Sequence, residues 1–183
     1  MTRLLAISGS LRSQSSNTTL LQAVAILAPP VVAVSIYDGI GNLPHFNPDL
    51  EETPGPAVLD FRRRLQESDG VLISSPEYAH GVPGVLKNAL DWIVGSGELV
   101  DKPVALINAS PQSTHAYASL AETIVVMSAR LVKNACVTLP FWNKTLDARG
   151  VAAHPEISAL LMKSIFEFVN AIEDRRTEGP GLL

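Results

Sequence analysis

The residues best suited to chemistry lie between positions 8 and 19, where hydroxyl and amide side chains surround one arginine. They follow a short apolar run at residues 3–7 and precede apolar residues at helical spacing. The first backbone N–H groups of a helix have no intrahelical partner, and the helix dipole places partial positive charge there. Hydroxyls and the Asn17 amide can complete the hydrogen bonds of a phosphate, and Arg12 can supply a cation. The stretch predicts a phosphate site, with a serine-rich helix cap as the alternative.

The spacing of the glycines excludes the two common phosphate-binding loops. A P-loop continues to a Gly-Lys pair, and no such pair follows Gly9. A dinucleotide-binding fingerprint that starts at Gly9 requires two further glycines, at the positions of Leu11 and Gln14. The sequence therefore predicts neither ATP in a P-loop nor NAD in a Rossmann crevice.

Composition and charge narrow the class of protein. The 183 residues are 46% hydrophobic and 17% charged, which favours one domain with a sizeable core. A net charge of −4 without a basic block argues against nucleic acid as a partner. No apolar run reaches the ~18 residues of a membrane span, and no signal-peptide pattern is present, so we expect a cytoplasmic protein without a membrane partner. Cys136 stands alone and the histidines are scattered, which predicts neither disulfides nor a metal site.

Apolar runs of strand length alternate with apolar residues at helical spacing along the chain. The expected strands are residues 3–7, 31–37, 69–74, 103–108 and 131–139. The expected helices follow these strands in turn, near residues 20–28, 58–67, 83–94, 120–127 and 157–172. Turn signals predict a long loop over residues 38–56. We expect a single domain over residues 1–174 and a flexible C-terminal tail over residues 175–183.

This alternation predicts an α/β fold. Strands joined by helix-length connections form a parallel sheet with helices on both faces. With a phosphate loop after the first strand, the pattern fits a flavodoxin-like, three-layer, doubly wound five-stranded sheet in the order 2-1-3-4-5. Such folds bind ligands at the carboxyl ends of the strands, where the winding reverses. We therefore expect three loops, residues 8–18, 75–84 and 109–115, to meet around one ligand.

Two motifs in these loops resemble the NADPH-dependent FMN reductase family of flavodoxin-like quinone, flavin and chromate reductases. The first motif is GSLRSQSSN at residues 9–17, and the second is PEYAHGVPGVLKNALDW at residues 76–92. The resemblance is close from the first strand through the third helix, and it extends over the whole chain in length and element order. It implies tightly bound FMN as the cofactor, with NADPH or NADH as co-substrate.

The resemblance implies roles for the residues that match these motifs. The phosphate of FMN would be held by the side chains of Ser10, Arg12, Ser15 and Asn17 and by the backbone of Ser16. The flavin rings and ribityl chain would lie on a stiff loop, largely on the backbone of Pro76, Glu77 and Tyr78. The loop near Ser110 would close the other edge of the rings. Backbone N–H groups aimed at the flavin N1/O2 edge would stabilise charge on the reduced ring.

Several residues of the second motif have alternative roles. Tyr78 is either an aromatic wall of the site or a core aromatic. Glu77 either lines the site or serves as a cap near the third helix. His80 either borders the nicotinamide or quinone site or lies on the surface. Trp92 packs either in an oligomer interface or in the core.

Two departures from the family pattern fall in the same loops. Ala79 stands where the family often has Asn, which removes one side-chain hydrogen bond near the flavin. Residues 110–113, Ser-Pro-Gln-Ser, stand where the family often has a Gly-Gly pair, and Pro111 has no N–H to donate. We expect altered geometry at the ring edges, with weaker FMN affinity or a changed choice of acceptor.

The resemblance implies an FMN-dependent NAD(P)H oxidoreductase. Hydride would pass from NADPH or NADH to FMN and then to a small-molecule acceptor, such as a quinone, a flavin, an azo compound or a metal oxyanion. Because the cofactor carries this chemistry, we assign no catalytic side chain. The resemblance also implies a homodimer or homotetramer. The alternatives are a flavodoxin-type FMN electron carrier without NAD(P)H turnover and a flavin-free protein of the same fold.

Overall fold

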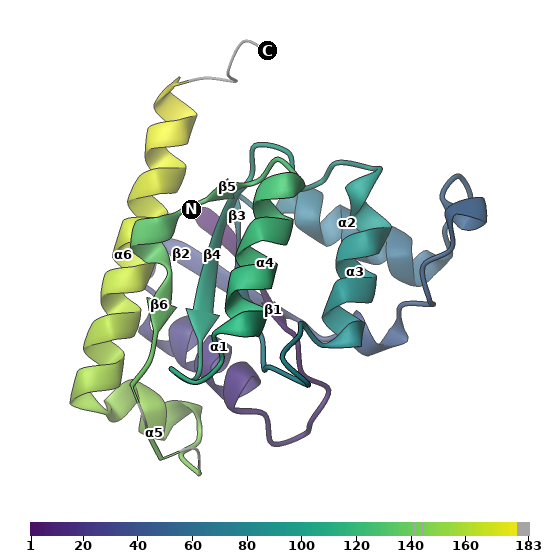
Figure 1. Cartoon of the computed structure of the whole chain (residues 1–183). Helices are drawn as coiled ribbons and strands as arrows, with labels where there is room; N and C mark the ends of the chain where they lie inside the picture. The colour runs from purple at the N-terminus through teal and green to yellow at the C-terminus, as the bar shows by residue number, and fades with distance from the viewer. Residues whose placement is uncertain (141, 144, 179–183) are drawn as a thin grey trace.

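A parallel sheet forms the centre of the molecule (Figure 1). The computed structural model describes residues 1–140, 142–143 and 145–178. The strands are β1 (Thr2–Ser8), β2 (Val32–Tyr37), β3 (Gly70–Ser74), β4 (Pro103–Asn108), β5 (Arg130–Leu131) and β6 (Val137–Thr138). Their order is β2-β1-β3-β4-β5, with β6 also paired to β4, and every pair is parallel. The predicted doubly wound order is confirmed.

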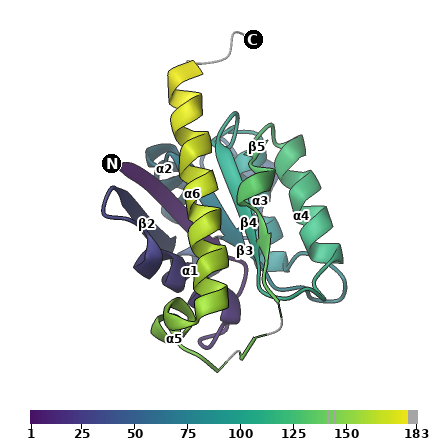
Figure 2. The same cartoon turned by 90° about the vertical axis from the view of Figure 1, so that its left-hand side faces the viewer.

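Helices cover both faces of this sheet (Figures 1 and 2). One face carries α1 (Ser16–Leu27), α5 (Ala148–Ala153) and α6 (Pro155–Glu178), and the other carries α2 (Pro56–Glu67), α3 (Gly84–Val94) and α4 (His115–Val126). In β1, Leu4 and Ala6 pack on the first face, whereas Leu5 and Ile7 pack on the second. Because both faces are covered, the strands are continuous apolar runs rather than alternating ones.

The last predicted strand, residues 131–139, is interrupted, so that part of the prediction is wrong. A 3₁₀ turn at Lys133–Ala135 separates β5 from β6. The Cys136 thiol accepts the backbone N–H of Leu106 at 3.3 Å, in a place where a continuous strand would offer a carbonyl. The Ser164 hydroxyl of α6 donates to the carbonyl of Ala135 and holds the turn against that helix.

The C-terminal region is more helical than the sequence indicates. The short helix α5 is additional, and its first turn is capped by Asp147, whose carboxylate accepts the N–H of Gly150 at 2.7 Å. Helix α6 continues to Glu178, so residues 175–178 of the predicted tail are helical. The rest of that tail, residues 179–183, lies outside the described residues.

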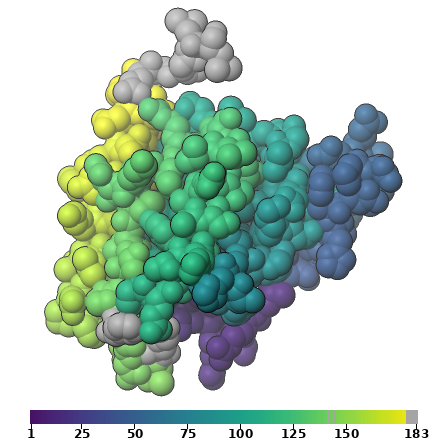
Figure 3. All heavy atoms as spheres, in the orientation of Figure 1, coloured from purple at the N-terminus to yellow at the C-terminus, as the bar shows by residue number. Residues whose placement is uncertain are grey.

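The loop predicted at residues 38–56 is confirmed, and it contains two 3₁₀ turns, Ile40–Asn42 and Pro48–Leu50. It projects from the side of the molecule (Figure 3). Its first half packs on α3, where the carbonyl of Pro44 accepts hydrogen bonds from the side chains of Asn88 and Trp92. Ile40 and Leu43 of the loop are buried in the core on the α3 side of the sheet.

Trp92 belongs to the core of a single chain. Its side chain is 0% exposed, its indole N–H donates to the Pro44 carbonyl at 2.7 Å, and Phe46 packs edge-on against it. The carbonyl of Trp92 accepts a 2.8 Å hydrogen bond from Arg62 of α2, whose side chain is only 14% exposed and lies 3.9 Å from Glu98. The structure thus supports the core alternative for Trp92.

Candidate functional site

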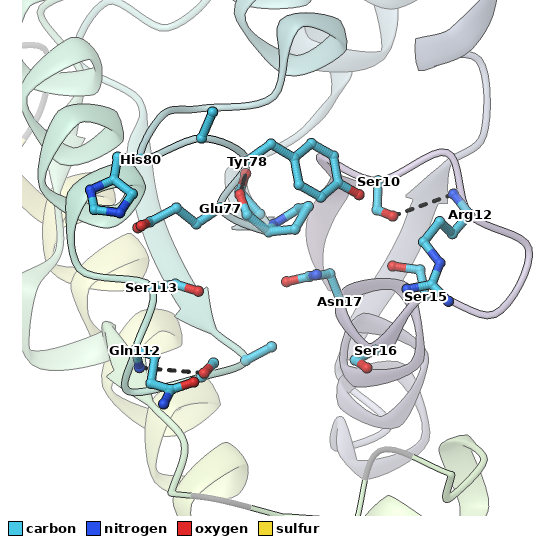
Figure 4. A pocket seen from close by; sticks show the side chains of 15 residues that line it. Ser10, Arg12, Ser15, Ser16, Asn17, Glu77, Tyr78, His80, Gln112 and Ser113 are labelled. Carbon is cyan, nitrogen blue, oxygen red and sulfur yellow. Dashed lines mark hydrogen bonds between the residues drawn. The ribbon is translucent and has the colours of Figure 1, made fainter.

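The three loops expected to meet do so at the carboxyl ends of β1, β3 and β4. They enclose a cavity of about 420 Å³ (Figure 4). All the residues that the sequence analysis assigned to the site line this cavity: Ser10, Arg12, Ser15, Ser16, Asn17, Pro76, Glu77, Tyr78 and Ser110. His80 and Ala79, which the sequence placed near the flavin or its co-substrate without assigning them to the site, also line the cavity. The remaining lining residues, expected only as parts of the loops, are Ser75, Ala109, Gln112 and Ser113.

The loop after β1 is shaped by its own hydroxyl groups. Ser15 is the N-cap of α1, and its hydroxyl accepts the N–H of Thr18 at 3.4 Å. Ser10 accepts the N–H of Arg12 at 3.3 Å, and the Thr18 hydroxyl donates to Ser8 at 2.8 Å. These bonds fix the loop around the first turn of α1, which contains no acidic residue. The dipole of α1 therefore reaches the cavity without a neutralising carboxylate from its own first turn.

Arg12 and Asn17 present polar groups to this end of the cavity. Within the described part of the chain, the exposed Arg12 guanidinium makes no ion pair or side-chain hydrogen bond. The Asn17 side chain is 6% exposed and is anchored to β3, because the Ser74 hydroxyl lies 2.9 Å from its amide oxygen. Figure 4 shows its amide projecting into the cavity. An available cation, a helix N-terminus and an anchored amide together suit a phosphate.

The loop after β3 forms the middle wall. Tyr78 is 51% exposed, so the core alternative for this residue is wrong. A two-residue turn follows, in which Tyr78 and Gly81 exchange backbone hydrogen bonds of 3.1 and 2.9 Å. The central residues Ala79 and His80 have φ of 50° and 59°. This left-handed conformation favours Asn and Gly, and it costs other residues roughly 1 kcal/mol each.

We predict that Ala79→Asn raises the stability of the flavin-free protein by about 1 kcal/mol, because Asn tolerates the left-handed conformation that this turn imposes. For a chain of this size the melting temperature should rise by about 2–4 °C. The control is Ala79→Val, which should lower it, since β-branched residues are disfavoured at positive φ. Thermal unfolding measures both, and equal melting temperatures would contradict the prediction.

Glu77 lines the cavity and caps a helix, although not the one predicted. Its carboxylate accepts the backbone N–H of Ala116 at 2.9 Å, in the first turn of α4. The expectation of a cap near the third helix is therefore wrong. The two partners are 39 residues apart, so no local pattern in the sequence reports this contact.

The loop after β4 is held by a buried amide that sequence reasoning missed. Asn108, the last residue of β4, accepts the N–H of Ser110 at 3.2 Å and donates to the carbonyl of Ser113 at 3.1 Å. The Ser110 hydroxyl accepts the N–H of Gln112 at 3.3 Å. These bonds shape the wall around Pro111 without the glycine pair of the family pattern. The signal that could have identified Asn108 from the sequence is its position as a polar residue at the end of a buried strand.

Two partly buried groups near the loop after β4, the Tyr117 hydroxyl and the Cys136 thiol, stay uncharged at neutral pH. Burial raises the pKa of Tyr117 to about 12, and it also raises the pKa of the Cys136 thiol beside it. Tyr117 lines a separate small cavity together with Ser75 and Ser113, which also line the main cavity. The described residues contain no group of three His, Cys, Asp or Glu that could hold a metal ion. None of the helices in the described chain is long and apolar enough to cross a membrane.

Comparison with known proteins agrees with this geometry. A family model described as NADPH-dependent FMN reductase matches residues 2–144. The chain is 34% identical to an NAD(P)H-dependent FMN reductase of Pseudomonas aeruginosa, over 81% of this chain and 83% of that protein. It is 35% identical to a quinone reductase of Pseudomonas putida, over 91% of this chain and 88% of that protein.

A solved structure is similar over nearly the whole chain. It is that of FerB, a flavoenzyme NAD(P)H:(acceptor) oxidoreductase from Paracoccus denitrificans. The TM-score is 0.85 and the identity 28%, and the match covers 95% of this chain and 98% of that one. The family match extends over all three loops of the cavity, since it spans residues 2–144. On this ground the chain belongs to the NADPH-dependent FMN reductase family.

Proposed function

We propose that this protein is an FMN-dependent NAD(P)H oxidoreductase that reduces a quinone, a flavin or a similar small acceptor. The observation that carries the proposal is the cavity in which the three loops meet, with Arg12, Ser15 and Asn17 among its lining residues from the first loop. The relatives at 34% and 35% identity are reductases, which argues against the flavodoxin-type carrier.

The residues present fit FMN. At one end, the available Arg12 cation, the Ser15-capped start of α1 and the Asn17 amide suit the phosphate. Pro76 and the half-exposed Tyr78 line the same cavity, and Figure 4 shows the Tyr78 ring directed toward Ser10. We place the flat rings between these residues and the loop that contains Ser110. FMN held by these residues would supply the hydride transfer between NAD(P)H and the acceptor.

The protein's own residues bind and orient rather than transfer protons. The loop after β3 and the loop after β4 shield the ring end of the cavity from water on two sides. The exposed edge of the cavity near Tyr78 and His80 is where we place the nicotinamide and the acceptor in turn. No side chain of the cavity is required as an acid or base, because the cofactor carries the chemistry.

Purification of the full chain, followed by spectroscopy and turnover, tests the proposal. We expect a yellow protein with flavin absorbance, release of FMN on denaturation as identified by chromatography, and steady oxidation of NADPH or NADH in the presence of benzoquinone. Flavin absorbance without NAD(P)H oxidation would identify a carrier. A colourless protein that takes up no added FMN would identify the flavin-free alternative.

We also propose that the protein works in the cytoplasm as a homodimer or homotetramer. Beside the cavity, an apolar groove is lined by Leu11, Tyr78, Pro83 and Val85. Leu11 is 64% exposed, and a contiguous apolar surface of this kind is typical of an interface. The free Cys136 and the need for NAD(P)H support a cytoplasmic location. Sedimentation of the purified chain measures the assembly, and a monomer at working concentration would contradict it.

A further inference from the structure

The loop after β3 contacts the first turn of α4 at two points. The Glu77 carboxylate accepts the N–H of Ala116 at 2.9 Å. The ring of His80 stacks on the ring of His115, with 4.3 Å between centroids and 28° between planes. Figure 4 shows Glu77 and His80 directed away from the phosphate end of the cavity, toward the side that holds Gln112 and Ser113. We call these two contacts the clasp.

Helix α4 lacks a cap from its own sequence. Thr114 stands at the N-cap position, but its backbone is helical and its side chain makes no capping bond. The first turn of α4 also contains no acidic residue. Glu77 therefore supplies both the acceptor and the negative charge that a helix N-terminus requires, from a different loop.

The clasp holds the loop after β4 at the end where that loop enters α4. The wall that contains Ser110 and Gln112 runs between β4 and α4. Asn108 holds the β4 end of this wall, through hydrogen bonds of 3.2 and 3.1 Å to Ser110 and Ser113. Glu77 holds the α4 end. Because Glu77 itself belongs to the loop after β3, its bond sets the separation between that loop and the loop after β4.

His80 adopts an unfavourable backbone conformation at this contact. Its φ of 59° costs roughly 1 kcal/mol relative to a glycine. Strained residues persist where surrounding contacts hold them, and they concentrate at ligand sites. The stack on His115 is such a contact, and His80 lines the cavity.

We propose that Glu77 is a positioning residue, which with the His80–His115 stack sets the width of the slot for the flavin rings. This inference rests on the proposed function, because it assumes that the ligand is FMN. It predicts that the clasp governs affinity for the rings and leaves affinity for the phosphate unchanged. Riboflavin, which has the rings without the phosphate, separates the two contributions.

The test measures the affinity of flavin-free protein for FMN and for riboflavin by quenching of flavin fluorescence. Glu77→Ala should weaken both by the same factor, about tenfold, which corresponds to about 1.4 kcal/mol. Glu77→Gln keeps an acceptor oxygen and should stay within about threefold of the wild type for both. Arg12→Ala is the matched control, which should weaken FMN alone.

Hydrogen exchange provides a readout that does not depend on flavin. In flavin-free Glu77→Ala, the Ala116 amide should exchange at least about tenfold faster, while amides of β3 keep wild-type rates. If Glu77→Ala proves unstable, His115→Ala removes only the stack and should weaken both flavins equally, by about threefold.

Three outcomes would overturn the proposal: unchanged affinity for both flavins, a loss confined to FMN, or an unchanged exchange rate at Ala116. A wild-type protein that binds neither flavin would instead refute the proposed function, and the exchange experiment would still report whether the clasp forms.

Discussion

Replacement of both Arg12 and Ser15 by alanine should weaken FMN binding by about 100-fold. A charge-assisted hydrogen bond to phosphate contributes about 1.5–3 kcal/mol and a neutral one about 1 kcal/mol, and together these correspond to a factor of about 100 or more. Arg12 has no competing ion pair among the described residues, so its full contribution is available to the ligand. Ser15 also caps α1, so its loss loosens the N–H groups that face the phosphate.

Equilibrium titration of the flavin-free double variant measures this effect. Riboflavin affinity should stay within about twofold of the wild type, because the ring end of the cavity is untouched. Lys163→Ala is the control for the loss of one positive charge, since Lys163 is exposed on α6 and lies outside the cavity lining. Wild-type FMN affinity in the double variant would mean that the phosphate binds elsewhere.

Trp92→Ala should lower the free energy of unfolding by about 3–5 kcal/mol. The side chain is among the largest fully buried ones in the chain, and its removal leaves a cavity between α3, Phe46 and the second face of the sheet. Denaturant unfolding of the flavin-free protein measures the change.

Trp92→Phe separates packing from hydrogen bonding. It keeps a ring and removes the indole N–H, but the Pro44 carbonyl still accepts a 2.9 Å bond from Asn88. We expect a smaller loss, about 1–2 kcal/mol. If Trp92→Ala dissociated an oligomer without lowering the unfolding free energy of the monomer, the interface alternative would be restored.

The order of the sheet and the position of the site were predictable because both follow from patterns that are local in the sequence. Leu4 to Ile7 alternate between the two cores, and burial on both faces turns this alternation into a continuous apolar run. Each polar loop directly follows such a run, and parallel strands place those loops at one edge of the sheet.

The contacts that shape the site in detail were not predictable, because they join residues far apart in the chain. Asn17 meets Ser74 across 57 positions, and Glu77 meets Ala116 across 39. The interruption before β6 depends in the same way on the contact between Cys136 and Leu106. Lys133 and Asn134 suggest an edge strand by their polarity, but polarity alone does not predict that the strand breaks.

This interruption affects how the protein meets other chains. The border of the sheet beyond β4 consists of β5 and β6, each only two residues long and separated by a 3₁₀ turn. An incoming strand from another molecule needs a longer straight row of free backbone groups to form a stable ladder. The broken border therefore protects this side of the molecule against strand addition, and so against aggregation through the sheet.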